Sequence, residues 1–514
     1  MRPLPRSIAL SIGEGALRAR RRVPAATGSS YDDRVLTRRH ALTALTAAPL
    51  AAVDGWTDVF NGHSLEGWKA SGNAASWRVE DGQLIGDGPT SHLFYTGGEF
   101  TNFELEAEVL TAPGCNSGVY FHTVFQEQGF PKKGFEVQVN NTAAGEGTYR
   151  ERKRTGSLYG IRNVHKQLAR DNEWTRLRVS VRGKNVQIWV NGLLTVDYTE
   201  PTPAVLPPSQ ETARFLDKGT FALQCHDPGS KVRYRSIRVR PLPATPAGAM
   251  FAADFTYKTI IGLGAKNYPL VDWHVHLKPG LGLKEAMERS RRDGLQYGIS
   301  ANCGRLSQFR TDAQARAFID SVKGESAFTG MQAEGGDWTK VFSRETCSAF
   351  DYIFNDGMIW TDTKGRWTRL YRPDDLGPIA DAETFMDQHV ERVVEMLTTQ
   401  PIDIYAIPTY LPPAINGQRE KLWTAARIAK VAEAAARGGV AIELNDRYQL
   451  PSEAFIRAAQ QAGCKFALGT GNSAADDLKR NEFGLETIQR CKLAWQDFFV
   501  PGAWRPRAIE RKWA

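Results

Sequence analysis

Two hydrophobic patterns follow one another along the chain. From residue 54 to 242, apolar and polar residues alternate in short runs separated by Gly, Asn and Pro, a pattern typical of β-strands. The clearest runs are 102–110, 117–125, 134–141, 175–183, 186–192, 219–226 and 234–242. Gly183-Lys184 and Asn191-Gly192 each predict a hairpin turn. Short strands at this spacing predict an all-β jelly-roll sandwich over 54–242.

Beyond residue 266 the period changes. Strand-like runs at 270–277, 295–303, 327–335, 350–358, 402–410, 440–446 and 465–472 alternate mostly with helical patterns such as 423–437 and 452–462. Gly294, Gly438 and Gly463 stand before three of these runs, where helix ends are expected. Strict β/α alternation predicts an α/β barrel of the (βα)7 type over 266–514. The Pro/Ala/Gly-rich stretch between the two patterns predicts a linker, assigned to 243–265.

The charge is concentrated near the start of the chain. The formal net charge is +8, and residues 1–53 hold nine Arg, no Lys and three acidic residues, a net of +6. The remainder therefore carries only 8 − 6 = +2. A body this close to neutral argues against a surface that tracks nucleic-acid phosphates.

That basic stretch predicts an export signal. Arg38 and Arg39 precede a mildly apolar run, 41–53, which is shorter than the about 20 residues needed to cross a bilayer. The segment 37–53 resembles a Tat signal. We therefore expect residues 1–53 to be a leader, the protein to be periplasmic or extracellular, and no stable membrane span. Six scattered cysteines form no C-x-x-C pair, which excludes a zinc knuckle or a dithiol redox motif.

Two strands of the sandwich carry hydrogen-bonding and titratable residues on one predicted face. Alternation places Tyr120 and His122 together, and likewise Glu136, Gln138 and Asn140. A polar sandwich face is often only the solvated side. The residue types here instead favour a site with acid and base groups.

The motifs of this region carry a specific resemblance. "GWTDVFNGHSLEGW", "SGVYFHT", "GFEVQVNN", "RTGSLYGI", "VQIWVNG" and "GTFALQCHDPGSKVRYRSIRV" occur in the order found in the 3-keto-disaccharide hydrolase domain. The stretch 54–242 resembles that family, a concanavalin A/laminin-G-like jelly roll. The resemblance implies a hydrolase acting on glycosidic bonds, with glycosides or oligosaccharides oxidised to a ketone at C3 as substrates.

Such a ketone acidifies the C2 hydrogen, so the glycosidic bond can break by elimination before water adds. This chemistry needs a base, an acid and enolate stabilisation, with no cofactor. Glu136 or His122 is the candidate base. The other candidates are Gln138, Arg154 or Arg235 to polarise the C3 oxygen, Tyr159 or His226 as acid or stacking partner, and Tyr120 and Asn140 as substrate-binding residues.

The first barrel strand predicts a second kind of site. Asp272, His274 and His276 alternate along it, so we expect them on one face, and carboxylate plus imidazole suits Zn, Mn or Fe. The region resembles the polymerase and histidinol phosphatase (PHP) family, with Glu334 and Glu443 at further strand ends. Only three His occur after residue 266, which makes a trinuclear cage improbable. The expectation is one divalent metal on His274, His276 and one or both of Glu334 and Glu443.

Two other functions remain open at this stage. The jelly roll could be a carbohydrate-binding module without turnover. The chemistry could instead lie in the barrel, as a metal-dependent PHP-like phosphoesterase or a sugar-processing enzyme.

Overall fold

The computed structural model describes residues 55–145, 149–206, 214–244, 251–362, 366–503 and 505–513. The predicted leader, 1–53, lies outside these residues.

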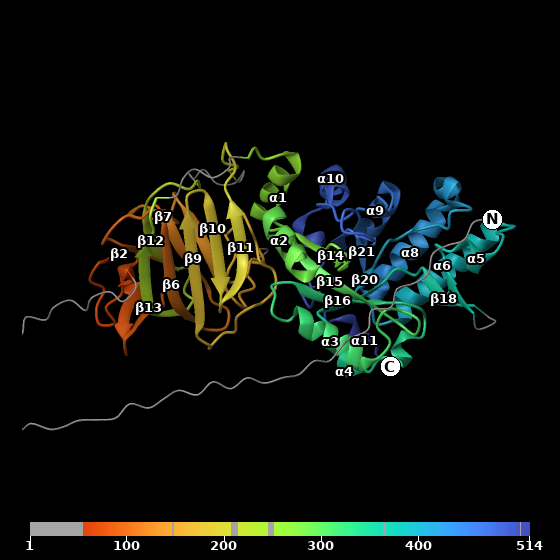
Figure 1. The fold of residues 1–514 in the computed structure, drawn as a ribbon, viewed down its shortest axis with the longest axis horizontal. Helices are drawn as coiled ribbons and strands as arrows, with labels where there is room; N and C mark the ends of the chain where they lie inside the picture. Colours follow the sequence, from red (N-terminus) through yellow and green to blue (C-terminus); the bar gives the residue numbers. More distant parts are fainter. Residues whose placement is uncertain are drawn as a thin grey trace, which may run out of the picture. The chain divides into compact units, whose positions relative to one another are not determined.

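Two antiparallel sheets form the sandwich in the first part of the chain (Figure 1). The first sheet has the strand order β11-β10-β9-β6-β13-β4-β3, and β1 pairs with β13. Its strands are β1 (Thr57–Asp58), β3 (Trp77–Glu80), β4 (Gln83–Gly86), β6 (Phe103–Thr111), β9 (Thr175–Arg182), β10 (Asn185–Val190), β11 (Leu193–Thr199) and β13 (Val232–Pro241). The second sheet has the order β2-β5-β12-β7-β8. Its strands are β2 (Trp68–Gly72), β5 (Ser91–Tyr95), β7 (Asn116–Thr123), β8 (Phe135–Asn140) and β12 (Thr220–Cys225).

The two predicted hairpin turns are confirmed. Arg182 pairs with Asn185, and Val190 pairs with Leu193, so each turn has two residues between the paired positions. Positive φ at Gly183, Asn191 and Gly192 gives these turns the twist that antiparallel strands require. Apolar side chains that alternate with the polar ones fill the space between the sheets, which confirms the sandwich.

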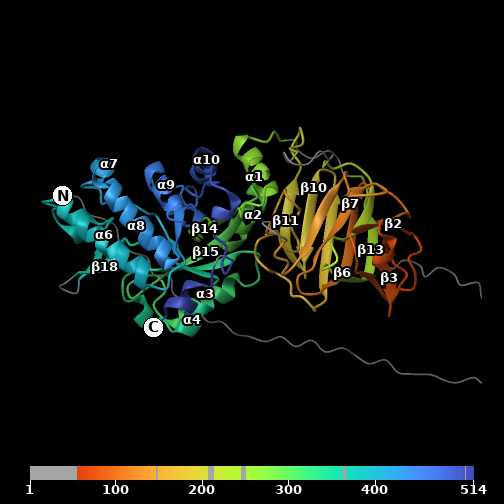
Figure 2. The same ribbon diagram turned by 180° about the vertical axis from the view of Figure 1, so that it is seen from behind.

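Seven parallel strands form the closed barrel in the second part (Figure 2). They are β14 (Val271–Val275), β15 (Gln296–Cys303), β16 (Phe328–Ala333), β17 (Tyr352–Asn355), β20 (Ile404–Tyr405), β21 (Ala441–Asn445) and β22 (Phe466–Gly469). The main helices are α2 (Leu283–Asp293), α3 (Asp312–Val322), α6 (Ala382–Thr399), α8 (Ala425–Gly438), α9 (Glu453–Gln461) and α10 (Glu482–Arg490). The short pieces are α4 (Arg344–Ser348), α5 (Pro373–Leu376), α7 (Arg419–Leu422), α11 (Ala508–Lys512) and the hairpin β18 (Ile359–Thr361) and β19 (Trp367–Arg369). The predicted fold class is confirmed.

Glycines end several of these helices. Gly294 caps α2 with a φ of 80°, as predicted. At α8 the left-handed residue is Gly439, and Gly438 is the last helical residue. The predicted position there was therefore one residue early.

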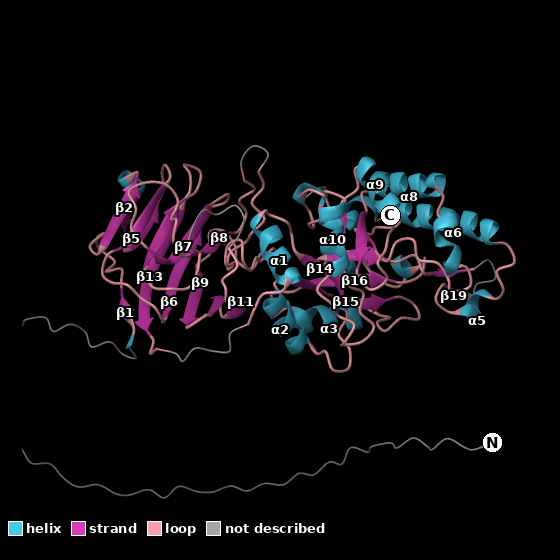
Figure 3. Cartoon of the chain, turned by 90° about the horizontal axis from the view of Figure 1, so that it is seen from above, coloured by secondary structure: helices cyan, strands magenta, loops and turns pink. Residues whose placement is uncertain are grey.

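The expected linker is wrong for residues 255–265, which form helix α1 (Phe255–Ala265). Asp254 caps this helix by accepting a hydrogen bond from the Tyr257 backbone N–H. Its side chains pack in two directions: Tyr257 and Ile261 belong to the sandwich core, whereas Ile260 and Leu263 belong to the barrel core. Pro, Ala and Gly before the helix masked this pattern in the sequence. Figure 3 shows α1 among the helices of the chain.

Among the described residues, no helix combines the length and apolar character needed to cross a membrane.

Candidate active site

The carboxylate of Glu136 lies at the centre of a buried polar group on the second sheet. Antiparallel pairing sets Glu136 opposite Tyr120, and Gln138 opposite Gly118. A Cβ at Gly118 would come within 2.3 Å of the Glu136 carboxylate oxygen Oε1. A side chain at position 118 would therefore force the Glu136 side chain to move.

Burial controls the chemistry of this carboxylate. Glu136 is only 5% exposed, and burial raises its pKa, although the Arg214 guanidinium opposes this effect. The Tyr120 hydroxyl accepts a hydrogen bond of 2.9 Å from Gln224 Nε2. Its own hydrogen is thus free for Glu136, with which it makes a hydrogen bond. Because burial outweighs this hydrogen bond, the Glu136 carboxylate is a stronger base than one in water.

Several polar atoms beside Glu136 are buried without a partner among the described residues. Gln138 donates from Nε2 to Asn116 Oδ1 at 2.8 Å, which leaves its Oε1 unused. The Oε1 of Gln224 and two guanidinium nitrogens of Arg214, Nε and Nη1, are also unpartnered. Buried polar groups are rarely left in this state unless a ligand or water completes them. These atoms are suited to a polyhydroxylated ligand.

A second acidic centre comes from the segment between β8 and β9. Glu151 Oε2 accepts hydrogen bonds from the hydroxyls of Tyr149 and Tyr159, the latter at 3.1 Å. Lys153 Nζ lies 3.5 Å from Glu151 Oε1 and is 1% exposed. Burial raises the pKa of both tyrosines, so they stay protonated at neutral pH. The Tyr159 backbone N–H donates to the Glu136 carbonyl oxygen at 2.9 Å, which places the two centres side by side.

Aromatic side chains border this group. Phe130 is 50% exposed and packs against His226, with ring centroids 5.5 Å apart. His226 Nδ1 lies 2.7 Å from Asp227 Oδ2, and the ring interacts electrostatically with Glu136. Tyr149 is 42% exposed. Exposed rings beside hydrogen-bonding groups can stack on the apolar face of a sugar.

His122 is not part of this group, and its predicted placement beside Tyr120 is wrong. Its φ is 55°, and the pairing of β7 with β12 shifts between Tyr120 and Thr123. This bulge turns the ring onto Phe103, where Nε2 lies 3.0 Å from the Thr101 carbonyl oxygen. Burial lowers the pKa of His122 to about 4, so the ring is a neutral packing residue.

Three other predicted residues make structural contacts. Asn140 donates to the Lys153 carbonyl and accepts from the Ala143 backbone N–H, so it shapes the loop. Arg154 donates to Asn140 Oδ1 at 3.3 Å. Arg235 belongs to the first sheet, where it bonds Glu108 at 2.8 Å and stacks on Trp174. The structure therefore brings Tyr120, Glu136, Gln138, Tyr159 and His226 together, and it does not bring His122 or Arg235 to them.

In the barrel, two of the expected metal ligands, His274 and Glu443, form a buried histidine–carboxylate pair. His274 Nδ1 lies 2.8 Å from Glu443 Oε1. Burial lowers the pKa of His274, but Glu443 more than offsets this, and the net shift is upward. The second Glu443 oxygen accepts from the backbone N–H of Ile407, whose φ of 43° is strained for a β-branched residue. Both oxygens of this carboxylate are therefore occupied.

The other predicted ligands also make hydrogen bonds to the protein. Glu334 accepts from Asn302 Nδ2 at 2.7 Å and from the Ser307 hydroxyl. His276 Nδ1 lies 3.1 Å from the Ser300 carbonyl oxygen. Asp272, expected on the same face, bonds Thr470 and Asn481 instead. Among the residues that the structure describes, no three His, Cys, Asp or Glu side chains are arranged to hold a metal ion.

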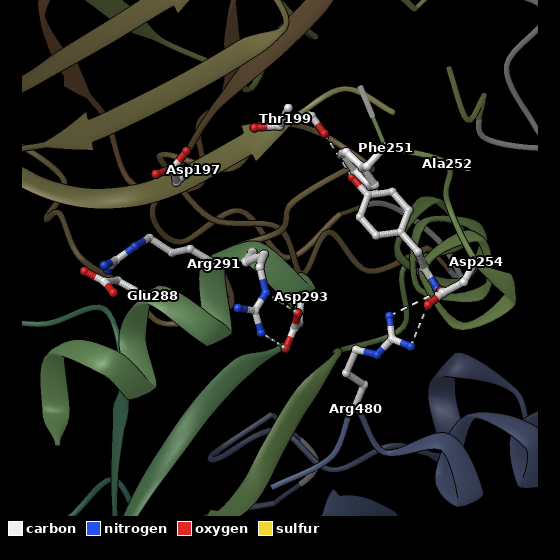
Figure 4. Close-up of a pocket in the computed structure, with 11 residues that line it drawn as sticks. Asp197, Thr199, Phe251, Ala252, Asp254, Glu288, Arg291, Asp293 and Arg480 are labelled. Carbon is white, nitrogen blue, oxygen red and sulfur yellow. Dashed lines mark hydrogen bonds and ion pairs between the residues drawn. The ribbon is translucent and has the colours of Figure 1, made fainter. Parts of the chain in front are cut away.

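A pocket of about 560 Å³ lies apart from both groups (Figure 4). Its lining includes Phe251, Tyr257 and two ion pairs. Arg480 binds Asp254 at 2.8 Å, and Arg292 binds Asp293 at 2.9 Å. Because these arginines already have carboxylate partners and no predicted site residue lines the pocket, we do not assign the chemistry to it.

Sequence reasoning missed four members of the polar group. Gln224 follows the same alternation as Tyr120 and could have been found from it. Glu151, Lys153 and Arg214 lie in irregular segments, where no period indicates which way a side chain points.

The first domain is therefore a jelly roll whose second sheet carries a group of buried acid, amide and tyrosine side chains. Residues 55–240 match the model of the 3-keto-alpha-glucoside-1,2-lyase-like domain. The barrel that follows lies outside that match. No curated protein matches the chain.

Solved structures with similar folds were also found. A "putative glycosyl hydrolase" from Parabacteroides distasonis is 24% identical, with a TM-score of 0.32, over 37% of this chain and 95% of that one. A carbohydrate-binding module from Bacillus subtilis is 13% identical, with a TM-score of 0.23, over 34% and 95% of the two chains. The VIP36 exoplasmic/lumenal domain in its Ca2+/Man-bound form is 13% identical, with a TM-score of 0.25, over 34% and 83%.

Proposed function

We propose that the protein cleaves 3-keto-glycosides, with the jelly roll as its catalytic domain. The observation that carries this proposal is the buried Glu136 carboxylate, which is paired with Tyr120 across the strands and interacts electrostatically with Arg214, two of whose guanidinium nitrogens have no partner among the described residues. The domain match over residues 55–240 supports the same class of substrate.

In the proposed reaction, Glu136 removes the C2 hydrogen as a proton. The C2–H electron pair forms the C1=C2 double bond, and the C1–O glycosidic bond breaks. Arg214 stabilises the negative charge that develops on the C3 oxygen. The aglycone oxygen receives a proton from Tyr159, whose raised pKa keeps it protonated beforehand. Water then adds across C1=C2 to give the free 3-keto sugar, so the net reaction is hydrolysis.

The other residues bind the sugar. Gln138 Oε1 and Gln224 Oε1 accept hydrogen bonds from ring hydroxyls, because both are buried without another partner among the described residues. Tyr120 holds Glu136 in place. His226 and Phe130 border the sugar face.

The test compares a 3-keto-glucoside with its unoxidised parent. We expect cleavage of the ketone only, because without it the C2 hydrogen is not acidic. In D2O, the residual substrate and the released sugar should carry deuterium at C2. Binding of either compound without cleavage would contradict the enzymatic proposal and favour a carbohydrate-binding module.

We also propose export of the protein through its twin-arginine segment. Arg38 and Arg39 with the apolar run 41–53 support this proposal. Changing both arginines to Lys should retain the protein in the cytoplasm of a Tat-competent host, as measured by cell fractionation. Unchanged export of the variant would contradict it.

A further inference from the structure

The segment that supplies Glu151, Lys153 and Tyr159 has almost no regular secondary structure. Between β8 and β9, its described residues (141–145 and 149–174) make only isolated bridges, at Leu158. Such a segment cannot fix its side chains by a strand ladder, so other contacts must position them. Some of those contacts come from the sandwich, such as the bond from the Tyr159 backbone N–H to the Glu136 carbonyl oxygen, and others come from residues at the start of the barrel sequence.

Asn267, in the loop between α1 and β14, makes three hydrogen bonds to this segment through the two polar atoms of its side chain. Its Nδ2 donates to the Arg150 carbonyl oxygen. Its Oδ1 accepts from the Arg152 backbone N–H at 3.3 Å and from Lys153 Nζ at 3.2 Å. A φ of 70°, which Asn tolerates better than most residues, directs the amide group to the segment.

Lys153 transmits this contact to the acidic centre. Its ammonium group is buried, which lowers its pKa, and a buried charge needs partners on all sides. The partners are Glu151 Oε1 at 3.5 Å, Asn267 Oδ1 and the ring of Tyr159, whose centroid is 4.4 Å away. Without Asn267, Lys153 loses one of these three contacts, and Glu151 and Tyr159 lose their fixed neighbour.

We propose that Asn267 is a positioning residue for the jelly-roll active site, acting through Lys153 and Glu151 on Tyr159. This inference rests on the proposed function. It assigns the barrel part of the chain a role in that reaction: its first loop completes a site whose catalytic side chains come from the sandwich.

The test uses the full chain with Asn267→Gly, because glycine accepts the positive φ and removes only the side chain. The matched control is Lys166→Met. Lys166 also connects the two parts of the chain, bonding the Ala327 carbonyl at 2.6 Å and Asp351 at 3.1 Å, but it does not touch Lys153. A third variant, Asn267→Asp, keeps a side-chain oxygen that can accept from Lys153. It tests whether this contact alone restores the properties lost in Asn267→Gly.

The first measurement is modification of Lys153 by an amine-reactive acetylating reagent, followed by mass spectrometry. We expect at least tenfold faster labelling in Asn267→Gly than in the wild type or in Lys166→Met. Equal labelling of Lys153 in all three would overturn the proposal. This measurement does not depend on turnover, so it remains decisive if the proposed reaction is wrong.

The second measurement is cleavage of the 3-keto-glucoside. In Asn267→Gly, we expect kcat to fall at least tenfold while KM stays within threefold of the wild-type value. In Asn267→Asp, most of the lost kcat should return. In Lys166→Met, kcat should equal that of the wild type. Equal losses of kcat in Asn267→Gly and Lys166→Met would show that Asn267 only stabilises the fold. Faster labelling with unchanged kcat would also overturn the positioning role.

Discussion

Tyr120 and Glu136 face each other across β7 and β8, and the Tyr120 hydroxyl accepts from Gln224 while it donates to Glu136. Tyrosine thus holds the carboxylate without neutralising it. Hydrogen bonding to the ionised form opposes the effect of burial on the pKa of Glu136. The balance keeps a proton acceptor in a buried position.

Replacing Glu136 by Gln should remove the base. The two side chains have nearly the same size, so we expect the fold and KM to change little, while kcat falls by about 10²–10⁴. Exchange of the C2 hydrogen in D2O, followed by NMR, should be lost in parallel. Because burial raises the pKa of Glu136, wild-type cleavage should decline as the pH falls through that raised pKa. Persistent C2 exchange in Glu136→Gln would assign the base to another group.

Gly118→Ala should impair the reaction without altering any polar group. The new methyl group would come within 2.3 Å of Glu136 Oε1, so the carboxylate has to move. We expect kcat to fall at least tenfold. The control is Gly98→Ala, where the nearest side-chain atom to the new Cβ would be 3.8 Å away. Equal kcat in the two variants would contradict the placement of Glu136.

His389→Leu should make the protein more resistant to acid. Both ring nitrogens of His389 are buried without a partner among the described residues, and burial lowers its pKa from 6.5 to about 3. Because His389 resists protonation in the folded state, its contribution to the free energy of unfolding is fully present above pH 6.5 and is lost as the pH falls toward 3. At pH 4 the difference of about 2.5 units corresponds to about 3 kcal/mol.

Urea unfolding at pH 7 and pH 4 measures this effect. We expect the wild type to lose about 3 kcal/mol more than His389→Leu between the two values, by the same linkage. The exposed His63, changed to Leu, is the control. Parallel losses in all three proteins would contradict the predicted burial of a neutral His389.

His274→Ala should destabilise the barrel rather than remove a cofactor. It leaves the Glu443 carboxylate buried without its partner, at an expected cost of about 3–5 kcal/mol in the free energy of unfolding. His276→Ala should cost less, because His276 Nδ1 faces only a backbone carbonyl oxygen. Metal analysis of protein purified without chelator should give the same metal content in the wild type and in the variant that combines His274→Ala with His276→Ala. Metal lost from the double variant would restore the metal-site hypothesis.

The sequence predicted the elements well where periodicity is strong. Alternation identified the sandwich strands, and the β/α alternation identified the barrel. It placed Tyr120, Glu136 and Gln138 on one face, because regular strands obey the two-residue period. It failed at His122, where a bulge reverses the side chain, and at Arg235, because a face cannot be assigned to a sheet before the strand order is known.

The hydrogen-bond partners of the barrel residues could not be predicted, for a different reason. His274 and His276 lie on the expected strand, but the sequence cannot show that Glu443 pairs with His274, or that Glu334 is already bonded to Asn302 and Ser307. Which acceptor a donor selects depends on tertiary distances. The same holds for Glu151 and Lys153, whose segment carries no period at all.

Helix α1 has a practical consequence for dissecting the chain. Its Tyr257 and Ile261 pack against the hydrophobic core of the sandwich, although both follow the last residue of the matched domain by more than a dozen positions. A fragment that ends at residue 240 would lack the Tyr257 and Ile261 side chains and would expose apolar surface to water. The matched segment, 55–240, is therefore shorter than the segment that folds as the first domain. A soluble fragment of this domain would have to extend through Ala265.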